Sequence, residues 1–409
     1  MRKIAAAMAI RIQYVYDVLA RCGIPKRRDF SRERAARVVE ACDRGVGITE
    51  AANYFGVSTS TATRRIRECR TNGRTLIVRR GRPRHGAPTI EQPLVNVDNP
   101  EVEAIYEHLR WLPFPYPRAA KDTGVVERVR AVVLQLVDGM IMPHSLVGVR
   151  FCAAFFPNRY EAASKWSLSA LAAWRDPNAL KRAIQFQLAH GRGITPRQVM
   201  LALTMRCRTP TIFKPLVARA IYERYCKVGD RVWDPCAGYG GRLLGAAAAG
   251  VVYVGSDVDE RTVEGNRRLA RSVGFDQATI HCTPAEDFNP PAVRFIFTSP
   301  PYFDRERYSR NDDQSWKKHG GSLEAWLAGF LHPVVERARA ALPSGGYFAL
   351  NVADLRERGK TVPLVDRTIG VALECGFLHV ETLRMPIVSI NRSVDSEPIL
   401  VFQRPRNTD

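Results

Sequence analysis

The chain has 409 residues, a length typical of two or three domains, and its 45% hydrophobic and 25% charged residues are typical of a packed globular protein. The 61 Lys and Arg outnumber the 41 Asp and Glu and give a net charge of +20, which favours a polyanionic partner over a membrane surface, because no amphipathic basic helix or membrane-spanning stretch accompanies the charge. Nine scattered cysteines without a CxxC pair argue against a zinc cluster and a disulfide framework, so we expect a cytoplasmic protein that holds no metal.

The first 77 residues predict a helix–turn–helix DNA-binding domain. Residues 1–90 hold 20 Lys and Arg against 7 Asp and Glu, a net charge of +13. Thr49 and Ser58 are placed to cap two helices that Gly56 separates. The second helix would offer to phosphates and base edges the side chains of Ser60, Thr61, Thr63, Arg64, Arg65 and Arg67. The segment resembles the helix–turn–helix at the start of insertion-sequence transposases and other mobile-element proteins, which implies duplex DNA as a partner; a small helical packing module is the alternative interpretation.

A basic linker, residues 78–98, leads to a middle region at residues 99–207. Gly and Pro in the linker disfavour regular structure, and its sequence Arg80-Gly81-Arg82-Pro83 matches the core of an AT-hook, which places arginines in a minor groove. A flexible linker without that role is the alternative. Amphipathic spacing predicts that the middle region is mostly helical, and it contains no catalytic grouping. We expect it either to contact DNA or to cover the catalytic domain.

The remainder, residues 208–409, has the pattern of an α/β fold. Short β-rich runs alternate with helical segments, which predicts a doubly wound, Rossmann-like sheet of seven strands that follows the helical middle region and the small helix–turn–helix domain. The predicted strands are 231–236, 251–258, 278–283, 294–300, 347–353, 377–385 and 397–405. The predicted helices are 240–249, 260–273, 322–341 and 362–375.

The ends of the first three strands predict a site for a nucleotide-like cofactor. The first strand leads into DPCAGYGGR, residues 234–242, whose three glycines allow a tight turn and a close approach of the backbone to a ligand. The second strand ends at Asp257, a carboxylate that can accept both hydroxyls of a ribose. After the third strand, Glu286 or Asp287 is placed to meet an adenine amino group, although both are equally compatible with solvated turn residues.

The fourth strand ends in FTSPPYF, residues 297–303, and this motif indicates the chemistry. Here the sequence resembles the S-adenosylmethionine-dependent amino-methyltransferases of DNA, whose hallmark is Asp, Asn or Ser followed by Pro-Pro and an aromatic residue. The resemblance covers roughly residues 209–405 and implies methyl transfer to the exocyclic amino group of a flipped base. Ser299 Oγ and the Pro300 carbonyl would accept the amino hydrogens, and Tyr302 would stack on the base. The predicted catalytic residues are Ser299, Pro300, Pro301 and Tyr302.

The same resemblance assigns the cofactor contacts. The segment 208–225 is similar to the one that packs beside the methionine part of the cofactor, with Phe213 and Pro215 as candidates and Lys214 less favoured. The full set of predicted cofactor-binding residues is Phe213, Pro215, Asp234, Cys236, Ala237, Gly238, Gly240, Asp257, Glu286 and Asp287. The loop 303–321 mixes five Lys or Arg with aromatic residues, which suits a strand or a flipped base, whereas an unstructured surface loop is the alternative.

The sequence does not decide which base is the target. In the family that the motif resembles, Ser in the first position is typical of members that act on the cytosine 4-amino group, so the resemblance implies cytosine first and the adenine 6-amino group second. Cys236 as the nucleophile of a carbon-5 cytosine enzyme is disfavoured, because it lies in the cofactor turn. RNA amino-methyltransferases also use a Pro-Pro-Tyr loop, and a DNA-binding regulator with an inactive methyltransferase domain is a further alternative.

Overall fold

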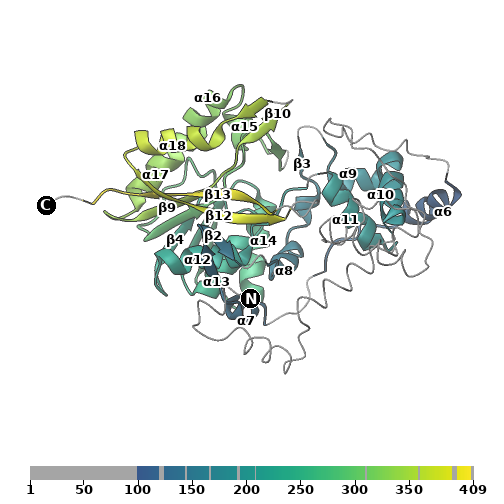
Figure 1. Cartoon of the computed structure of the whole chain (residues 1–409), viewed down its shortest axis with the longest axis horizontal. Helices are drawn as coiled ribbons and strands as arrows, with labels where there is room; N and C mark the ends of the chain where they lie inside the picture. The colour runs from purple at the N-terminus through teal and green to yellow at the C-terminus, as the bar shows by residue number, and fades with distance from the viewer. Residues whose placement is uncertain are drawn as a thin grey trace, which may run out of the picture. The chain divides into compact units, whose positions relative to one another are not determined.

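The computed structural model describes residues 99–118, 124–142, 145–164, 167–190, 194–207, 209–308, 311–357, 360–388 and 394–406 (Figure 1). All of them belong to the second of two compact units, which begins at Val95. The predicted helix–turn–helix and AT-hook lie outside the described residues. The DNA-contact candidates Ser60, Thr61, Thr63, Arg64, Arg65, Arg67, Arg80 and Arg82 therefore stay predictions.

A nine-stranded sheet of order β1-β2-β12-β13-β9-β7-β4-β5-β6 forms the centre of this unit. The seven predicted strands are confirmed as β4 Arg231–Asp234, β5 Val252–Asp257, β6 Ala278–Cys282, β7 Phe295–Thr298, β9 Tyr347–Asn351, β12 Leu378–Val388 and β13 Val394–Gln403. Strands β9, β7, β4, β5 and β6 run parallel, and β13 pairs antiparallel with both β9 and β12. The parallel strands have the chain order 3-2-1-4-5 of a doubly wound fold, so the predicted Rossmann-like α/β class is confirmed.

Two further strands come from the middle region, where helix was expected. They are β1 Gln135–Val137 and β2 Met140–Met142, and β2 pairs with β12 at the edge of the sheet. Asp138 and Gly139 join them with φ angles of 51° and 75°. An Asp-Gly pair that adopts positive φ at both positions is the usual turn of a two-residue hairpin, which explains why this segment leaves the helical pattern.

Helices cover both faces of the sheet. On one face are α7 Val125–Ala131, α8 Val149–Ala153, α12 Pro215–Tyr225, α13 Gly241–Ala249 and α14 Glu260–Ser272. On the other are α16 Leu323–Trp326, the π-helical turn η2 Leu327–Leu331, α17 His332–Ala341 and α18 Leu364–Glu374, and Figure 1 shows α17 and α18 opposite α12 and α13. A hydrophobic core lies on each face of the sheet, and the buried strand β7 contributes to both. Phe295 and Phe297 belong to the first core and Ile296 belongs to the second, because successive side chains of a strand point to opposite faces.

The rest of the middle region forms its own helical cluster. It contains α6 Pro100–Leu109, α9 Ala170–Arg175, α10 Pro177–Ala189 and α11 Pro196–Arg206, packed around Trp174 and Leu180. Proline begins α6, α10 and α11, and Asn99, Asp176 and Thr195 cap them with side-chain hydrogen bonds. The short helix η1 Pro157–Tyr160 leads from α8 to this cluster, and in the described part of the chain no helix is long and apolar enough to cross a membrane.

Several short elements lie outside the nine-stranded sheet. The strand β3 Ala163–Ser164 of the middle region pairs antiparallel with β8 Glu306–Arg307, which lies just after the SPPY motif. The short helix α15 Ser315–Lys318 follows in the same loop, and β10 Leu355–Glu357 with β11 Lys360–Val362 forms a separate hairpin. The β3–β8 pairing fastens the loop after the motif to the middle region.

Candidate functional site

A cavity of about 1060 Å³ opens at the carboxyl ends of β4, β5, β7 and β9. Strands β4 and β7 lie side by side, and the chain leaves β4 towards β5 but leaves β7 towards β9 on the opposite side. Such a reversal of strand order is the point at which doubly wound sheets bind ligands. The turn after β4, Asp257 at the end of β5 and the SPPY motif after β7 all contribute to the lining.

The glycine turn contains two kinds of glycine. Gly238 has a φ of 55° and lines the cavity, and its N–H donates to Asp257 Oδ2 at 2.9 Å. Gly240 and Gly241 instead make room for protein atoms: a Cβ on Gly240 would lie 2.4 Å from Leu269, and a Cβ on Gly241 would lie 1.9 Å from the Phe213 carbonyl oxygen. The expected close approach to a ligand therefore applies to Gly238. Gly240 does not line the cavity and is needed for packing.

Asp257 is held in place by the turn that it faces. Its two carboxylate oxygens accept the N–H groups of Gly238 and Asp259, at 2.9 and 3.1 Å. An ionised carboxylate offers about four acceptor positions, so two remain for hydroxyl donors in the cavity. Burial raises the pKa of Asp257 from 3.8 to about 6, only in part offset by these two hydrogen bonds. The side chain is thus preorganised to receive a pair of hydroxyl groups.

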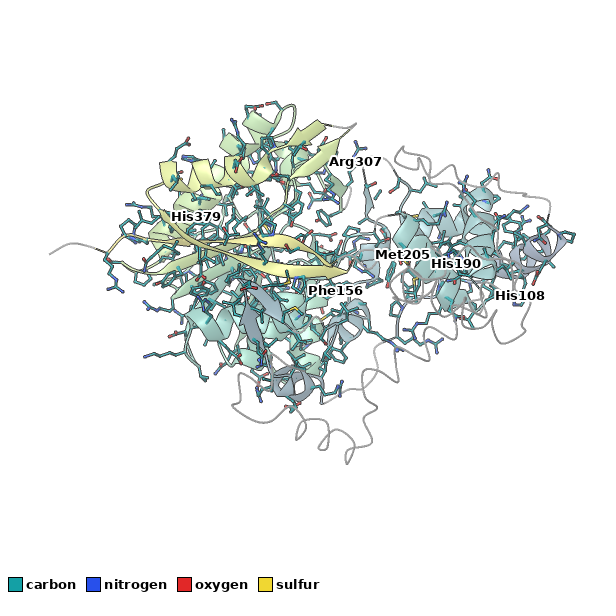
Figure 2. The ribbon with its side chains drawn as sticks, viewed as in Figure 1. His108, Phe156, His190, Met205, Arg307 and His379 are labelled. Carbon is teal, nitrogen blue, oxygen red and sulfur yellow. The ribbon has the colours of Figure 1, made fainter. Side chains whose placement is uncertain are left out.

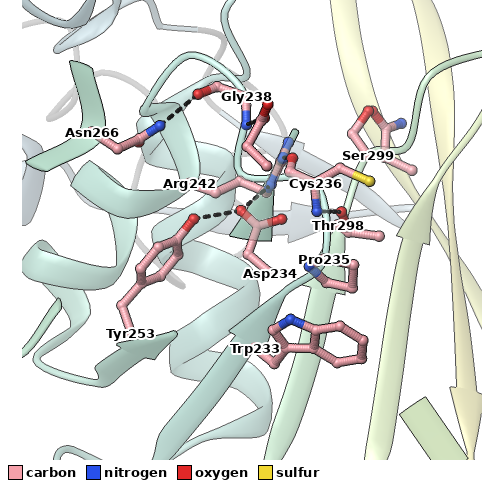
Figure 3. A network of polar contacts seen from close by, with 12 residues as sticks. Trp233, Asp234, Pro235, Cys236, Gly238, Arg242, Tyr253, Asn266, Thr298 and Ser299 are labelled. Atoms are coloured by element: carbon pink, nitrogen blue, oxygen red, sulfur yellow. Dashed lines mark hydrogen bonds and ion pairs between the residues drawn. The ribbon is translucent and has the colours of Figure 1, made fainter. Parts of the chain in front are cut away.

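Asp234 has a different position from the one expected. Its carboxylate is fully buried and is absent from the cavity lining. Its Oδ2 atom accepts from Arg242 Nε at 2.8 Å and from the Tyr253 hydroxyl at 2.7 Å, and Arg242 also donates to the Cys236 carbonyl (Figure 3). Arg242, which itself lines the cavity, thus joins Asp234 to the glycine turn, and the assignment of Asp234 to direct cofactor contact is corrected.

Cys236 joins the two central loops through its backbone. Its N–H donates to Thr298 Oγ1 at 3.1 Å, which connects the turn after β4 to the end of β7 (Figure 3). The residue lines the cavity, and burial raises the pKa of its thiol well above the ordinary value. A thiol that stays protonated is a poor nucleophile, so the site does not favour carbon-5 chemistry.

The two adenine candidates are separated by the structure. Glu286 is 4% exposed and lines the cavity, where its carboxylate is 2.9 Å from His319 Nε2 and 3.2 Å from Lys318 Nζ. Asp287 is exposed, pairs with Lys318 and does not reach the cavity. Of the two, only Glu286 is placed to meet a ligand.

The SPPY motif lines the cavity with all four residues, Ser299, Pro300, Pro301 and Tyr302. Both hydroxyl groups of the motif point to Asn351, the last residue of β9: Ser299 Oγ donates to Asn351 Oδ1 at 3.2 Å and the Tyr302 hydroxyl donates to it at 3.4 Å. Asn351 Nδ2 donates to the Pro398 carbonyl at 2.9 Å, which fixes the orientation of its amide. Asn351 is 1% exposed and lines the cavity, and the sequence interpretation missed it.

The backbone after the motif adopts an unusual conformation. Phe303 has a φ of 52°, in the left-handed region that bulky residues rarely adopt, and its N–H donates to the Pro301 carbonyl at 3.0 Å. Its ring packs edge-on against Trp326, with the ring centroids 6.1 Å apart. Such conformations cost free energy and gather at functional sites, so this turn supports the choice of the motif as the reactive centre.

Of the candidates in the segment upstream of β4, some line the cavity and one does not. Phe213 and Lys214 line the cavity, and Phe213 meets Phe297 edge-on with ring centroids 5.3 Å apart. Pro215 is the first residue of α12 and is buried, outside the lining. Ala237, another of the predicted cofactor contacts, also lines the cavity. Lys214 donates to the Pro386 carbonyl, so this side chain closes the wall next to the antiparallel hairpin.

Comparison with known proteins gives one sequence match and several structural ones. Over 95 residues the chain is 37% identical to the tRNA (guanine(10)-N2)-dimethyltransferase of Methanothermobacter thermautotrophicus, a match that covers 23% of this chain and 28% of that protein. The chain therefore spans well under half the length of that relative. No protein-family model matches the chain.

Two solved structures have a similar arrangement over part of the chain. TrmN from Thermus thermophilus is 18% identical, with 64% of this chain and 88% of that chain covered and a TM-score of 0.34. The N-methyltransferase NodS from Bradyrhizobium japonicum, in complex with S-adenosyl-L-homocysteine, is 12% identical, with 47% and 86% covered and a TM-score of 0.33. At these TM-scores the fold class rests on the strand order described above.

Proposed function

We propose that the chain binds S-adenosylmethionine in this cavity and transfers its methyl group to an exocyclic amino group of a nucleic-acid base. The observation that carries the proposal is the convergence of Asp257, Gly238 and the SPPY motif on one cavity, although they follow three different strands. The match over 95 residues to a tRNA amino-methyltransferase supports the same chemistry.

The donor and acceptor set of the cavity fits this cofactor. Asp257 retains two acceptor positions for the ribose hydroxyls, and Gly238 presents open backbone beside it. Glu286 lines the cavity next to Ala285, where a carboxylate and a small apolar surface suit an adenine ring with its amino group. When bound, the cofactor supplies a methyl group that its sulfonium has already activated.

The residues of this chain would then prepare the amine. Because the Ser299 hydroxyl proton is directed to Asn351, the lone pairs of Ser299 Oγ are left to accept a hydrogen from the amino group. The Pro300 carbonyl would accept the second hydrogen, which favours a pyramidal, more nucleophilic nitrogen. The ring of Tyr302 would stack on the base and hold it in line with the methyl group.

DNA cytosine is the first substrate that we propose, with the product N(4)-methylcytosine, and DNA adenine comes next. Ser299 at the head of the motif and the net charge of +13 over residues 1–90 support this choice. RNA is the second candidate, because the curated relative is named as a tRNA methyltransferase.

Two successive experiments, on cofactor binding and then on methyl transfer, test the proposal. Calorimetry of the full chain should show binding of S-adenosylmethionine, and isotope-labelled methyl groups should then move to DNA or RNA in parallel reactions. A folded chain that binds no cofactor would overturn the proposal, and binding without transfer to either nucleic acid would favour the inactive regulator.

A further inference from the structure

We propose that the outer part of the cavity is a cleft for a single-stranded segment of nucleic acid that flanks the target base. One wall of this cleft is formed by η1 and α11 of the middle region, and the other by the loop after the SPPY motif. The inference rests on the proposed function and assigns a role to the middle region, whose sequence contains no catalytic grouping.

The cavity is large for a single small ligand. Pockets for a single small ligand reach roughly 1,000 Å³ at the upper end of their range. The cavity of about 1060 Å³ extends from Asp257 and Ala285 at the strand ends to Leu201 and Met205 in α11. A cofactor at the strand ends and a base at the SPPY motif therefore leave the α11 side for neighbouring nucleotides.

The α11 wall presents apolar side chains that a folded protein normally covers. Arg197, Leu201 and Met205 are spaced four residues apart and thus share one face of the helix, and all three line the cavity. Leu201 is 46% exposed and Met205 is 47% exposed, and Leu146 on the same lining is 57% exposed. Figure 2 labels Met205 among the side chains of the helical cluster. A polarisable apolar strip of this kind suits the faces of bases.

The charge on this wall has one sign. Among the described residues of the middle region that line the cavity, the charged ones are Arg150, Arg159 and Arg197, and none carries a carboxylate. Arg159 is fixed in place, because its guanidinium lies 4.6 Å from the centre of the Tyr160 ring and one Nη donates to the Pro210 carbonyl at 2.7 Å. A guanidinium has five donors, so others stay available for phosphate oxygens.

The opposite wall combines arginine with aromatic rings. Arg305, Tyr308 and Trp316 line the cavity, and the Arg307 guanidinium lies 5.1 Å from the centre of the Trp316 ring. The β3–β8 pairing joins Ala163 to Arg307 and thereby ties this loop to the middle region. Backbone hydrogen bonds therefore connect this loop to the middle region, which supplies the other wall.

The distribution of charge also indicates which wall the phosphates of a bound strand face and which wall its bases face. Asp313 and Glu397 line the cavity on the side of the loop and of β13, where they would repel phosphates. The phosphates of a bound strand should therefore follow Arg150, Arg159 and Arg197, with the bases turned towards Tyr308 and Trp316. Arginine along the backbone and aromatic rings against the bases are the usual means by which proteins hold single strands.

Cysteine footprinting of the full chain tests the cleft without depending on methyl transfer. In Met205→Cys the alkylation rate of the new thiol is followed by peptide mass spectrometry, with and without a single-stranded DNA or RNA oligonucleotide. The matched control is Leu373→Cys, because Leu373 is 50% exposed on α18 and lies outside the cavity lining. At about ten times its Kd the oligonucleotide should slow alkylation about tenfold at position 205 and leave position 373 unchanged.

The outcomes separate this inference from the proposed function. Equal rates at position 205 with and without either oligonucleotide would overturn the cleft, even if the chain transfers methyl groups. Equal protection by heparin would overturn the assignment to a nucleic-acid strand. If Met205→Cys does not fold, Leu201→Cys serves in its place, because Leu201 lies one turn earlier on the same face.

Discussion

Ser299 donates a hydrogen bond to Asn351 across the gap between two parallel strands, with 3.2 Å between Oγ and Oδ1. Strands β7 and β9 pair in register up to Thr298 and Leu350, so the next residue of each strand places these two side chains next to each other. The Tyr302 hydroxyl meets the same oxygen at 3.4 Å. Asn351 thus orients both polar groups of the motif from one buried position.

Replacing Asn351 by leucine should therefore lower kcat more than it changes cofactor affinity. Without the acceptor, the Ser299 hydroxyl is free to rotate, and a loss of about 1–3 kcal/mol corresponds to a roughly tenfold to hundredfold lower rate. Steady-state kinetics and calorimetry with S-adenosylhomocysteine measure the two effects. The Ser299→Ala background is the control: if Asn351→Leu costs as much there as in the wild type, Asn351 does not act through Ser299.

Tyr302 should be needed for its ring more than for its hydroxyl. Tyr302→Phe keeps the stacking surface and should retain most of the turnover, whereas Tyr302→Ala should lower kcat by roughly tenfold to hundredfold through the lost stacking of about 1–3 kcal/mol. Methyl transfer to an oligonucleotide measures both variants. Equal activity of the alanine and phenylalanine variants would exclude a stacking role.

Cofactor affinity should fall as the pH is lowered through about 6. Burial raises the pKa of Asp257 to about 6. As the pH falls through this value, the carboxylate is protonated and loses the negative charge that attracts the two hydroxyl groups. Below that pKa the Kd should rise up to about tenfold per pH unit, and Asp257→Asn should remove this dependence. The stability of the ligand-free protein should depend on pH in the opposite way. Because the pKa of Asp257 in the folded protein lies above 3.8, this group lowers the free energy of unfolding as the pH rises from 3.8 to about 6. Calorimetry at pH 5, 6 and 7 tests the dependence.

Cys236→Ser should leave methyl transfer nearly unchanged. The raised pKa of the buried thiol disfavours it as a nucleophile, and the contact to Thr298 uses the backbone N–H, which serine retains. Kinetics of the serine variant measure this directly. Abolished turnover in a folded Cys236→Ser variant, together with a methyl group on a ring carbon, would replace the proposed mechanism.

The buried pair behind the glycine turn should dominate local stability. Arg242→Met leaves the Asp234 carboxylate fully buried without its ionic partner, and this should lower the free energy of unfolding by about 3–5 kcal/mol. Arg271→Ala is the matched control, because its ion pair with Glu264 is exposed and should contribute under about 1 kcal/mol. Denaturant unfolding measures both, and similar values for the two variants would contradict the structural role of Arg242.

The sequence allowed the strands of the sheet to be predicted, and with them the meeting of the strand-end motifs at one cavity, since strand periodicity and the turn after each strand are local signals. It did not allow the direction of a side chain at a strand end to be predicted, so Asp234 was assigned to the cofactor although it faces Arg242. Asn351 was missed for a related reason: it is a single polar residue at the end of an apolar run, and its partner Ser299 lies 52 residues earlier. The Asp138-Gly139 hairpin was a local signal that was present and overlooked.

Mass spectrometry of nucleosides tests the central claim most directly. DNA and RNA are incubated with S-adenosylmethionine and the wild-type chain, or with the double variant Ser299→Ala and Tyr302→Ala, and are then digested completely. The account predicts a base methylated on its exocyclic amino group, N(4)-methylcytosine in DNA first of all, and its absence from the reaction with the double variant. A methyl group on a ring carbon, or a methylated base formed equally by the double variant, would contradict it.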